Sequence, residues 1–243
     1  MSDLAGIIVL NKPTGITSAK ALYRVRSITR QRKSGHAGTL DPGASGVLLL
    51  CLGRATKLVE SLMELPKVYR ATARLDITSD SFDSDSETRA VAGVVAPSPE
   101  RVVEVVRSFE GEINQVPPRV SALKVGGQPA YKLARDGRDF ELAPRTVHVY
   151  WTHVHSYRWP ELEFEVCCGR GTYVRSLIRD IGEGLGTGGC LTSLVRSRVG
   201  PFMIEDSWTA ERLASLGDFS EAIIAPDAVT RLSQNAAVPE RPA

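Results

Sequence analysis

A glycine-rich turn joined to an apolar run constrains this chain more than any other stretch of its 243 residues. Residues 35–46 read G-H-A-G-T-L-D-P-G-A-S-G, which predicts a sharply turning backbone that another molecule can approach closely. The apolar run 47–52 follows at once, so the turn is attached to a buried element. Asp41 is the only carboxylate of this turn and a candidate for chemistry. A tight turn whose aspartate only caps its own backbone is the alternative.

The bulk composition is that of a globular chain, with 42% hydrophobic and 24% charged residues. No apolar stretch approaches the length of a membrane span, and the N-terminal apolar stretch 7–10 is too short for a signal peptide. We therefore expect no membrane association. The four cysteines form no C-x-x-C pair, which argues against a zinc site or a disulfide framework and favours a reducing cytoplasm.

Positive charge is concentrated near the N-terminus. Residues 4–40 contain seven lysines and arginines and no acidic residue, although the whole chain has a net charge of only +2. A basic block next to a candidate catalytic loop predicts a polyanionic partner, most simply nucleic acid. A solvated helix face that binds nothing is the alternative.

Alternation of apolar and polar residues predicts strands, and apolar residues spaced by three or four predict helices. The predicted strands are 7–10, 68–77, 147–155 and 162–166. The predicted helices are 18–29 with Ser18 as N-cap, 58–62 before Pro66, 97–109, 130–135, and one capped by Thr172 that ends at Gly182, Gly184 and Gly186. The elements are mixed without a βαβ rhythm, so we predict an α+β fold with a mostly antiparallel sheet.

An acidic, serine-rich loop follows the strand predicted at 68–77. It contains Asp80, Asp83, Asp85 and Glu87 and has no apolar run of its own. Connections of this composition usually lie at the protein surface and move more than the elements they join. We therefore expect this loop to be exposed and mobile.

A second charged feature lies where a strand meets a helix, at G-R-G-T-Y-V-R, residues 169–175. A glycine-flanked helix start attracts anions, although the spacing of a phosphate-binding P-loop is absent. Tyr173 and Arg175 fall in the first turn, and Arg175 is a candidate partner for a carboxylate elsewhere. If that carboxylate is Asp41, the pairing keeps it ionised and fixes its direction. The alternative places Arg175 on the solvent face of the helix.

Five ordered motifs resemble the bacterial tRNA pseudouridine synthase B family. They are N-K-P-x-G-x-x-S at 11–18, G-H-A-G-T-L-D-P at 35–42, K-x-Y-R at 67–70, P-P-x-x-S-A-L-K at 117–124 and G-R-G-T-Y-V-R at 169–175. The resemblance covers about residues 6–205. It implies the pseudouridine synthase fold, with a mostly antiparallel mixed sheet flanked by helices.

The resemblance implies isomerisation of uridine 55 in the TΨC loop of tRNA, on a base flipped out of its stack. Asp41 would be the nucleophile, and Arg175 would pair with it. Tyr69 would stack on the flipped base and help to remove the C5 proton. Tyr173 would help to hold either Asp41 or the base. From its strand position alone, Tyr69 would only pack in the core.

The resemblance also implies supporting roles for three further residues. His36 would fill the space that the bases vacate, Leu194 would pack on the target base, and Lys12 with Pro13 would support the catalytic loop. It implies no cofactor and no metal. The expected partner is the T-arm stem-loop of tRNA, bound by a monomer in the cytoplasm without an obligate protein partner.

The resemblance also sets the expected domain division. Residues 1–205 form the catalytic domain, 206–232 a short extension, and 233–243 a disordered tail. The extension is too short for the C-terminal RNA-binding domain found in many family members. Arg119 and Val120 replace the usual apolar residue and tyrosine, so local RNA contacts are expected to differ.

Three other functions compete with this hypothesis. A non-catalytic tRNA-binding or folding factor is disfavoured because Asp41, Tyr69 and Arg175 are all present. An aspartate-dependent hydrolase or phosphoryl-transfer enzyme is disfavoured because metal-ligand clusters and a P-loop are missing from the sequence. A guide-RNA-directed pseudouridine synthase would be expected to carry additional partner-binding surfaces.

Overall fold

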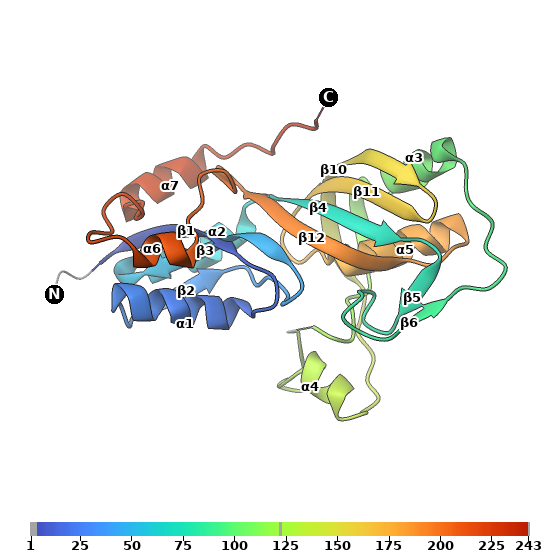
Figure 1. The fold of residues 1–243 in the computed structure, drawn as a ribbon, viewed down its shortest axis with the longest axis horizontal. Coiled ribbons are helices and arrows are strands. Elements are labelled where there is room, and N and C mark those ends of the chain that lie inside the picture. Colours follow the sequence, from blue (N-terminus) through green and yellow to red (C-terminus); the bar gives the residue numbers. More distant parts are fainter. Residues whose placement is uncertain (1–3, 122, 243) are drawn as a thin grey trace. The chain divides into compact units, whose positions relative to one another are not determined.

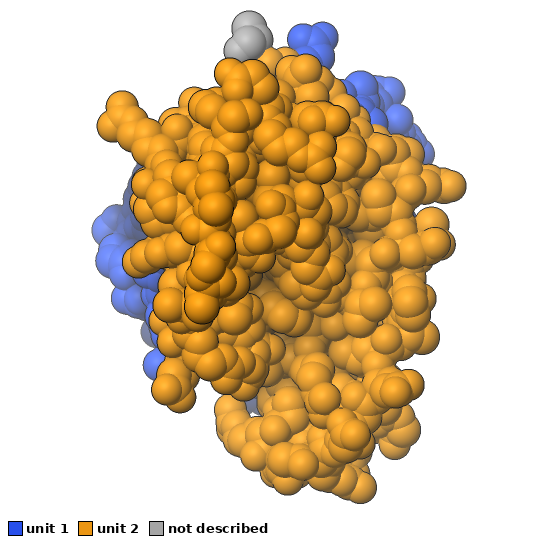
Figure 2. Space-filling model, turned by 90° about the vertical axis from the view of Figure 1, so that its right-hand side faces the viewer, with its two compact units in different colours: residues 1–69, 194–240 blue, residues 70–193, 241–243 orange. Residues whose placement is uncertain are grey.

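The computed structural model describes residues 4–121 and 123–242, which form two compact units (Figure 1). Unit 1 combines residues 1–69 with 194–240, and unit 2 combines residues 70–193 with 241–243 (Figure 2). The chain passes between the units within β4 (Lys67–Arg74), within β12 (Cys190–Val199) and again after Glu240. The fold is α+β with a mixed sheet flanked by helices, as predicted.

Unit 1 is organised around β3 (Ser45–Leu52), which is the apolar run recognised in the sequence. It pairs antiparallel with β1 (Gly6–Lys12) and β2 (Ser34–Ala37), and parallel with β12 through Val195–Ser45 and Arg196–Gly46. Every residue from Val47 to Leu52 is fully buried. The predicted buried element after the glycine-rich turn is therefore confirmed.

Short helices cover the strands of unit 1 (Figure 1). Their bounds, with the 3-10 helix η1 and the edge strand β13, are α1 (Ser18–Thr29), η1 (Gly53–Leu58), α2 (Val59–Glu64), β13 (Phe202–Met203), α6 (Ala210–Ala214) and α7 (Pro226–Gln234). Helices α1 and α2 contact β2, and α7 contacts β1. The core between them is apolar and includes Ile7, Val47, Leu49, Leu62 and Val229.

The cap of α1 differs from the prediction. The side chain of Thr17, not Ser18, accepts the N–H of Lys20 (3.1 Å). Thr17 has extended backbone angles, as an N-cap requires, whereas Ser18 is already helical and buried. The helix ends at Arg30, which has a left-handed φ of 53°. Because this residue leaves the helical path, the basic residues beyond it belong to a turn rather than to the helix face.

The strand order in unit 2 is β4, β11 (Glu161–Cys168), β10 (Arg145–Arg158) and β7 (Gly111–Gln115), and β10 pairs antiparallel with both β11 and β7. Helix α3 (Pro99–Ser108) contacts both β10 and α5 (Val174–Leu185). Two small hairpins and one short helix complete the unit: β5 (Ile77–Ser79) with β6 (Thr88–Ala90), β8 (Lys124–Val125) with β9 (Gln128–Pro129), and α4 (Ala130–Arg135).

Two predicted elements of unit 2 have different bounds. The strand predicted at 68–77 is interrupted after Arg74. There the N–H of Leu75 donates to Pro160 O, and the carbonyl of Leu75 accepts from the N–H of Gly188, so neither group continues a strand ladder. Helix α5 has Tyr173, not Thr172, at its N-cap. It continues through two glycines and ends at Gly186, whose φ of 68° suits a helix C-terminus.

The two units divide the chain differently from the expected ranges 1–205, 206–232 and 233–243. Unit 1 joins the N-terminal third to residues 194–240. Helix α7 reaches Gln234, and Ala236 packs against the core of unit 1. Within the described ranges, no helix is long and apolar enough to cross a membrane.

Candidate active site

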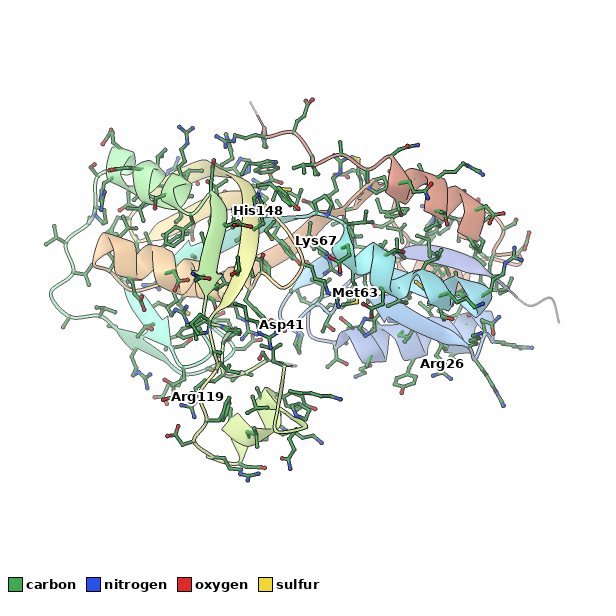
Figure 3. All side chains as sticks on the ribbon, turned by 180° about the vertical axis from the view of Figure 1, so that it is seen from behind. Arg26, Asp41, Met63, Lys67, Arg119 and His148 are labelled. Atoms are coloured by element: carbon green, nitrogen blue, oxygen red, sulfur yellow. The ribbon has the colours of Figure 1, made fainter. Side chains whose placement is uncertain are left out.

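Asp41 lies half-buried in the loop between β2 and β3 (Figure 3). The preceding residue, Leu40, is held by Ser18, whose Oγ donates to Leu40 O (2.9 Å) and accepts from Leu40 N (2.8 Å). The following residue, Pro42, accepts the N–H of Gly15 at its carbonyl (2.8 Å). The backbone is therefore fixed on both sides of the carboxylate, as a reactive group on a rigid scaffold requires.

Lys12, at the end of β1, is a fully buried cation close to this loop. Its Nζ donates to Pro13 O and Ile16 O, both at 2.8 Å. Burial lowers the pKa of Lys12 from 10.5 to about 8, although the negative charge of Asp41 acts in the opposite direction. Lys12 thus organises the turn after β1 and lies within the electrostatic reach of Asp41.

A second buried cation, Arg196 on β12, was not recognised in the sequence. It is 1% exposed. Its Nε donates to Val47 O (2.7 Å), its Nη2 to Gly38 O (3.0 Å) and its Nη1 to the hydroxyl of Tyr69 (3.5 Å). The period-two alternation of a strand places Arg196 on the same face as Leu194, and that signal could have identified it as buried.

Tyr69 is half-buried on β4, and the guanidinium carbon of Arg196 lies 6.0 Å from the centre of its ring. Lys67 begins the same strand, is buried, and donates from its Nζ to the carbonyl of Met63 at the end of α2 (Figure 3). This bond fixes the start of β4 two residues before Tyr69. Leu194, on β12, is 9% exposed.

His36 lies on β2, opposite Leu50 of β3. Its Nδ1 is buried and has no hydrogen-bond partner within the described part of the chain. Burial lowers the pKa of His36, and the positive charge of Arg196 lowers it further. Both effects favour the neutral form of the imidazole.

Arg175 lies in the first turn of α5 in unit 2 and is only 4% exposed. Its Nη1 lies 3.2 Å from Oδ2 of Asp83 and 3.1 Å from Ser81 O, and its Nη2 donates to Val120 O (2.9 Å). The alternative in which Arg175 sits on the solvent face is therefore wrong. Tyr173 precedes the helix, and its backbone N donates to Oε1 of Gln115 (2.8 Å).

The acidic loop at residues 80–87 is exposed at Asp80, Asp85 and Glu87, as predicted, but not at Asp83. Asp83 was expected to be exposed and mobile, but its side chain is 15% exposed. Oγ of Ser81 donates to Oδ1 of Asp83 (2.6 Å), and the N–H of Asp85 donates to the same oxygen (3.2 Å). If the Asp83 carboxylate moved out to solvent, the buried charge of Arg175 would be left unpaired, which is costly. These contacts therefore hold Asp83 in place.

The residues expected to form the site therefore fall in both units. Unit 1 holds Asp41, Tyr69, His36, Lys12 and Leu194, whereas unit 2 holds Arg175 and Tyr173. The pairing of Asp41 with Arg175 concerns two side chains from different units and stays a prediction. Among the described residues, no group of three or more His, Cys, Asp or Glu side chains is arranged to hold a metal.

Two family models match consecutive parts of the chain. The TruB family pseudouridylate synthase N-terminal domain matches residues 26–174, and the tRNA pseudouridylate synthase B C-terminal domain matches residues 175–227. The tRNA pseudouridine synthase B of Francisella philomiragia subsp. philomiragia is 43% identical over 218 residues, which are 88% of this chain and 71% of that protein. The enzyme of the same name from Francisella tularensis subsp. tularensis is 41% identical over 215 residues, with the same coverage.

Solved structures agree with these relatives. The Cbf5-Nop10-Gar1 complex contains a chain that superposes with a TM-score of 0.74 at 31% identity, covering 93% of this chain and 62% of that one. An H/ACA RNP bound to a substrate RNA containing 2′-deoxyuridine gives a TM-score of 0.71 at 28% identity, covering 93% and 61%. This chain thus spans less than two thirds of these structural neighbours. The matched family models and the identity with the Francisella enzymes show that it belongs to the TruB family of tRNA pseudouridine synthases.

Proposed function

We propose that this protein is a tRNA pseudouridine-55 synthase, which isomerises uridine 55 in the TΨC loop of tRNA with Asp41 as the nucleophile. The proposal is carried by the loop of Asp41, because its backbone is bonded on both sides of the carboxylate and a buried cation lies nearby. The protein acts as a cytoplasmic monomer on the T-arm, without a guide RNA or an obligate protein partner.

The proposed reaction breaks the bond between N1 of the uracil and C1′ of the ribose and forms a bond between C5 and C1′. The hydrogen on C5 leaves as a proton, and N1 gains one, so atoms and electrons balance without an oxidant or a reductant. Asp41 supplies a nucleophile that adds either to C1′ or to the pyrimidine ring. A neighbouring group must then remove the C5 proton.

The remaining residues of unit 1 position the flipped base. Tyr69 stacks on the uracil and helps to remove the C5 proton, and Leu194 packs on the same base. His36 fills the space that the bases vacate, and a neutral ring there avoids a second charge beside Arg196. Lys12 holds the turn that begins at Pro13.

In unit 2, Arg175 is proposed to pair with Asp41 and to keep it ionised. Its bonds to Ser81 O and Val120 O and its ion pair with Asp83 pre-organise the guanidinium before substrate binds. Tyr173 helps to hold either Asp41 or the base. Asp41 belongs to unit 1 and Arg175 to unit 2.

Extruding a uridine from the T-loop costs a few kcal/mol of unstacking, which contacts to the RNA backbone must offset. We propose that α1 and the turn after it supply such contacts. The exposed basic side chains there are Lys20, Arg24, Arg30, Arg32 and Lys33. Tyr23 is 62% exposed on the same helix, with the guanidinium of Arg26 5.2 Å from its ring centre. An exposed aromatic ring beside cations suits an RNA strand.

The direct test is to incubate the purified protein alone with unmodified tRNA transcript and to map pseudouridine by carbodiimide-dependent primer extension. The expected result is one new stop, at position 55, and none in a transcript carrying cytidine there. A transcript that stays unmodified at position 55 under enzyme excess would contradict the proposed function.

A further inference from the structure

Arg196 spans the loop that carries Asp41. Its Nη2 binds the carbonyl of Gly38, three residues before Asp41, and its Nε binds the carbonyl of Val47, six residues after it. One planar guanidinium therefore contacts the backbone on both sides of the loop. The third contact, from Nη1, reaches the hydroxyl of Tyr69.

The backbone around Arg196 fits the same loop closely. Gly46 pairs with Arg196 in the parallel β3–β12 ladder, and a Cβ at Gly46 would lie 2.2 Å from Arg196 O. Gly38 has a φ of +83°, and a Cβ there would approach Nη1 of Arg196 to 3.4 Å. Gly46 thus allows the close approach of the Arg196 backbone, and Gly38 allows the left-handed φ at the other end of the loop.

Burial of a charged group is costly unless its donors are satisfied. The acceptors of Arg196 are two backbone carbonyls and a phenol, and each is attached to a part of the proposed site. A lysine could not reproduce these contacts, because its ammonium is a single point on a flexible stem, whereas guanidinium donors point in several fixed directions.

We propose that Arg196 is a positioning residue that holds the Asp41 loop and the hydroxyl of Tyr69 in one fixed arrangement, ready for the target uridine. This inference rests on the proposed function, because its effect on rate can be measured only if the protein modifies tRNA. It deepens that function by naming the group that couples the nucleophile loop to the aromatic residue. Displacement of reacting groups by about 1 Å costs roughly 10²-fold in rate, so small movements of this loop matter.

The test compares Arg196→Lys and Arg196→Met with the control Arg198→Lys. Arg198 lies two residues further along β12, is half-buried, and donates from Nε to Gly200 O (2.7 Å). Arg196→Met removes the charge at similar volume, so no unpaired charge stays buried, although the two carbonyls lose a donor. It is therefore expected to fold even if Arg196→Lys does not.

Single-turnover rates on tRNA under enzyme excess, tRNA affinity and melting temperature are measured for each variant. Both Arg196 variants are expected to lose roughly 10²-fold in single-turnover rate, with tRNA affinity within about threefold of wild type. Arg198→Lys should keep the wild-type rate. A folded Arg196 variant that turns over as fast as Arg198→Lys would overturn the proposal.

Amide hydrogen exchange of residues 38–47 gives a second readout that needs no activity. Exchange in this loop should be faster in both Arg196 variants than in wild type and in Arg198→Lys. Unchanged exchange would show that Arg196 does not hold the loop. If wild-type protein fails to modify tRNA, the proposed function is wrong, while the exchange measurement still decides whether Arg196 fixes the loop.

Discussion

Unit 1 contains two kinds of cation, and their surroundings differ. Arg30, Arg32 and Lys33 lie exposed at and beyond the end of α1, where salt screens their charge. Lys12 and Arg196 are buried. The hydrogen bonds that their side chains donate end on backbone carbonyls and on the hydroxyl of Tyr69. We infer that exposed cations capture RNA, whereas buried cations set the geometry of the reacting groups. Substitutions should therefore separate into effects on binding and effects on rate.

The largest effect in this comparison is expected at Arg175, the buried cation of unit 2. Arg175→Met should lower the single-turnover rate by roughly 10²–10³-fold, because the proposed pairing of its guanidinium with Asp41 is lost. Binding of tRNA should change little. An Arg175→Met variant with a wild-type rate and weaker tRNA binding would show that this buried cation acts in binding. It would contradict the division between exposed and buried cations.

Asp83→Asn tests what keeps that buried cation in place. Removing one partner of a buried ion pair leaves the other charge uncompensated, and we expect unfolding to become easier by about 3–5 kcal/mol. Urea unfolding measures this loss. Asp80→Asn is the matched control in the same loop, because its carboxylate is 80% exposed and pairs with the exposed Arg89. Its expected effect is about 0–1 kcal/mol. Equal losses in the two variants would refute the assignment of Asp83.

Neutralising the exposed cations should change binding and leave the rate unaffected. In the triple variant Arg30→Gln, Arg32→Gln and Lys33→Gln, tRNA affinity should fall and its dependence on salt should weaken. The slope of log affinity against log salt is expected to decrease by about 2–3 units, at about 0.7–0.9 per lost phosphate contact. The double variant Arg101→Gln and Arg107→Gln on α3 is the control. If the triple variant had a lower rate at saturating tRNA and an unchanged dependence of affinity on salt, these cations would act on the rate and not on binding. That result would contradict the proposed separation of exposed and buried cations.

The smallest effect is a change in titration. Lys12 should titrate with a pKa of about 8, which lysine-selective NMR can measure. Asp41→Asn should lower the pKa of Lys12 further, and Arg196→Met should raise it, because Asp41 stabilises the charged amine and Arg196 opposes it. Arg198→Lys should leave it unchanged. A pKa of Lys12 that does not respond to Asp41→Asn would show that the two groups do not interact.

The lowered pKa of Lys12 also makes folding stability depend on pH. The unfolded chain holds the Lys12 proton up to about pH 10.5, whereas the folded chain releases it near pH 8. Between these values the unfolded state binds more protons, so the contribution of Lys12 to stability rises with pH across that window. Below pH 8 both states are protonated and the full cost of burying the charge is present.

Sequence patterns predicted the local features of the fold but not the contacts between distant segments. The run 47–52 and the helix 18–29 were identified because hydrophobic periodicity is a local property. The assignment of Ser18 as a cap was wrong, because its partner is Leu40, 22 residues away. Sequence spacing carries no information on such a pair.

Sequence reasoning also misjudged two charged residues that are largely shielded from solvent. Asp83 was expected at the surface because acidic residues in loops usually are, but it pairs with the buried Arg175 and accepts hydrogen bonds from Ser81 and Asp85. Arg196 was not identified, although it lies two residues after Leu194 and therefore on the same face of β12. A charged residue at an inward position of a strand is therefore a useful signal, even where its partners are unknown.

The central claim is that Asp41 is the nucleophile. The most direct measurement is single-turnover conversion of uridine 55 by wild type and Asp41→Asn under enzyme excess, with tRNA binding measured in parallel. We predict that wild type and the surface control Asp80→Asn convert the site. Asp41→Asn should bind tRNA normally but lose more than about 10⁴-fold in rate. Conversion by Asp41→Asn at a rate close to that of wild type would contradict the account.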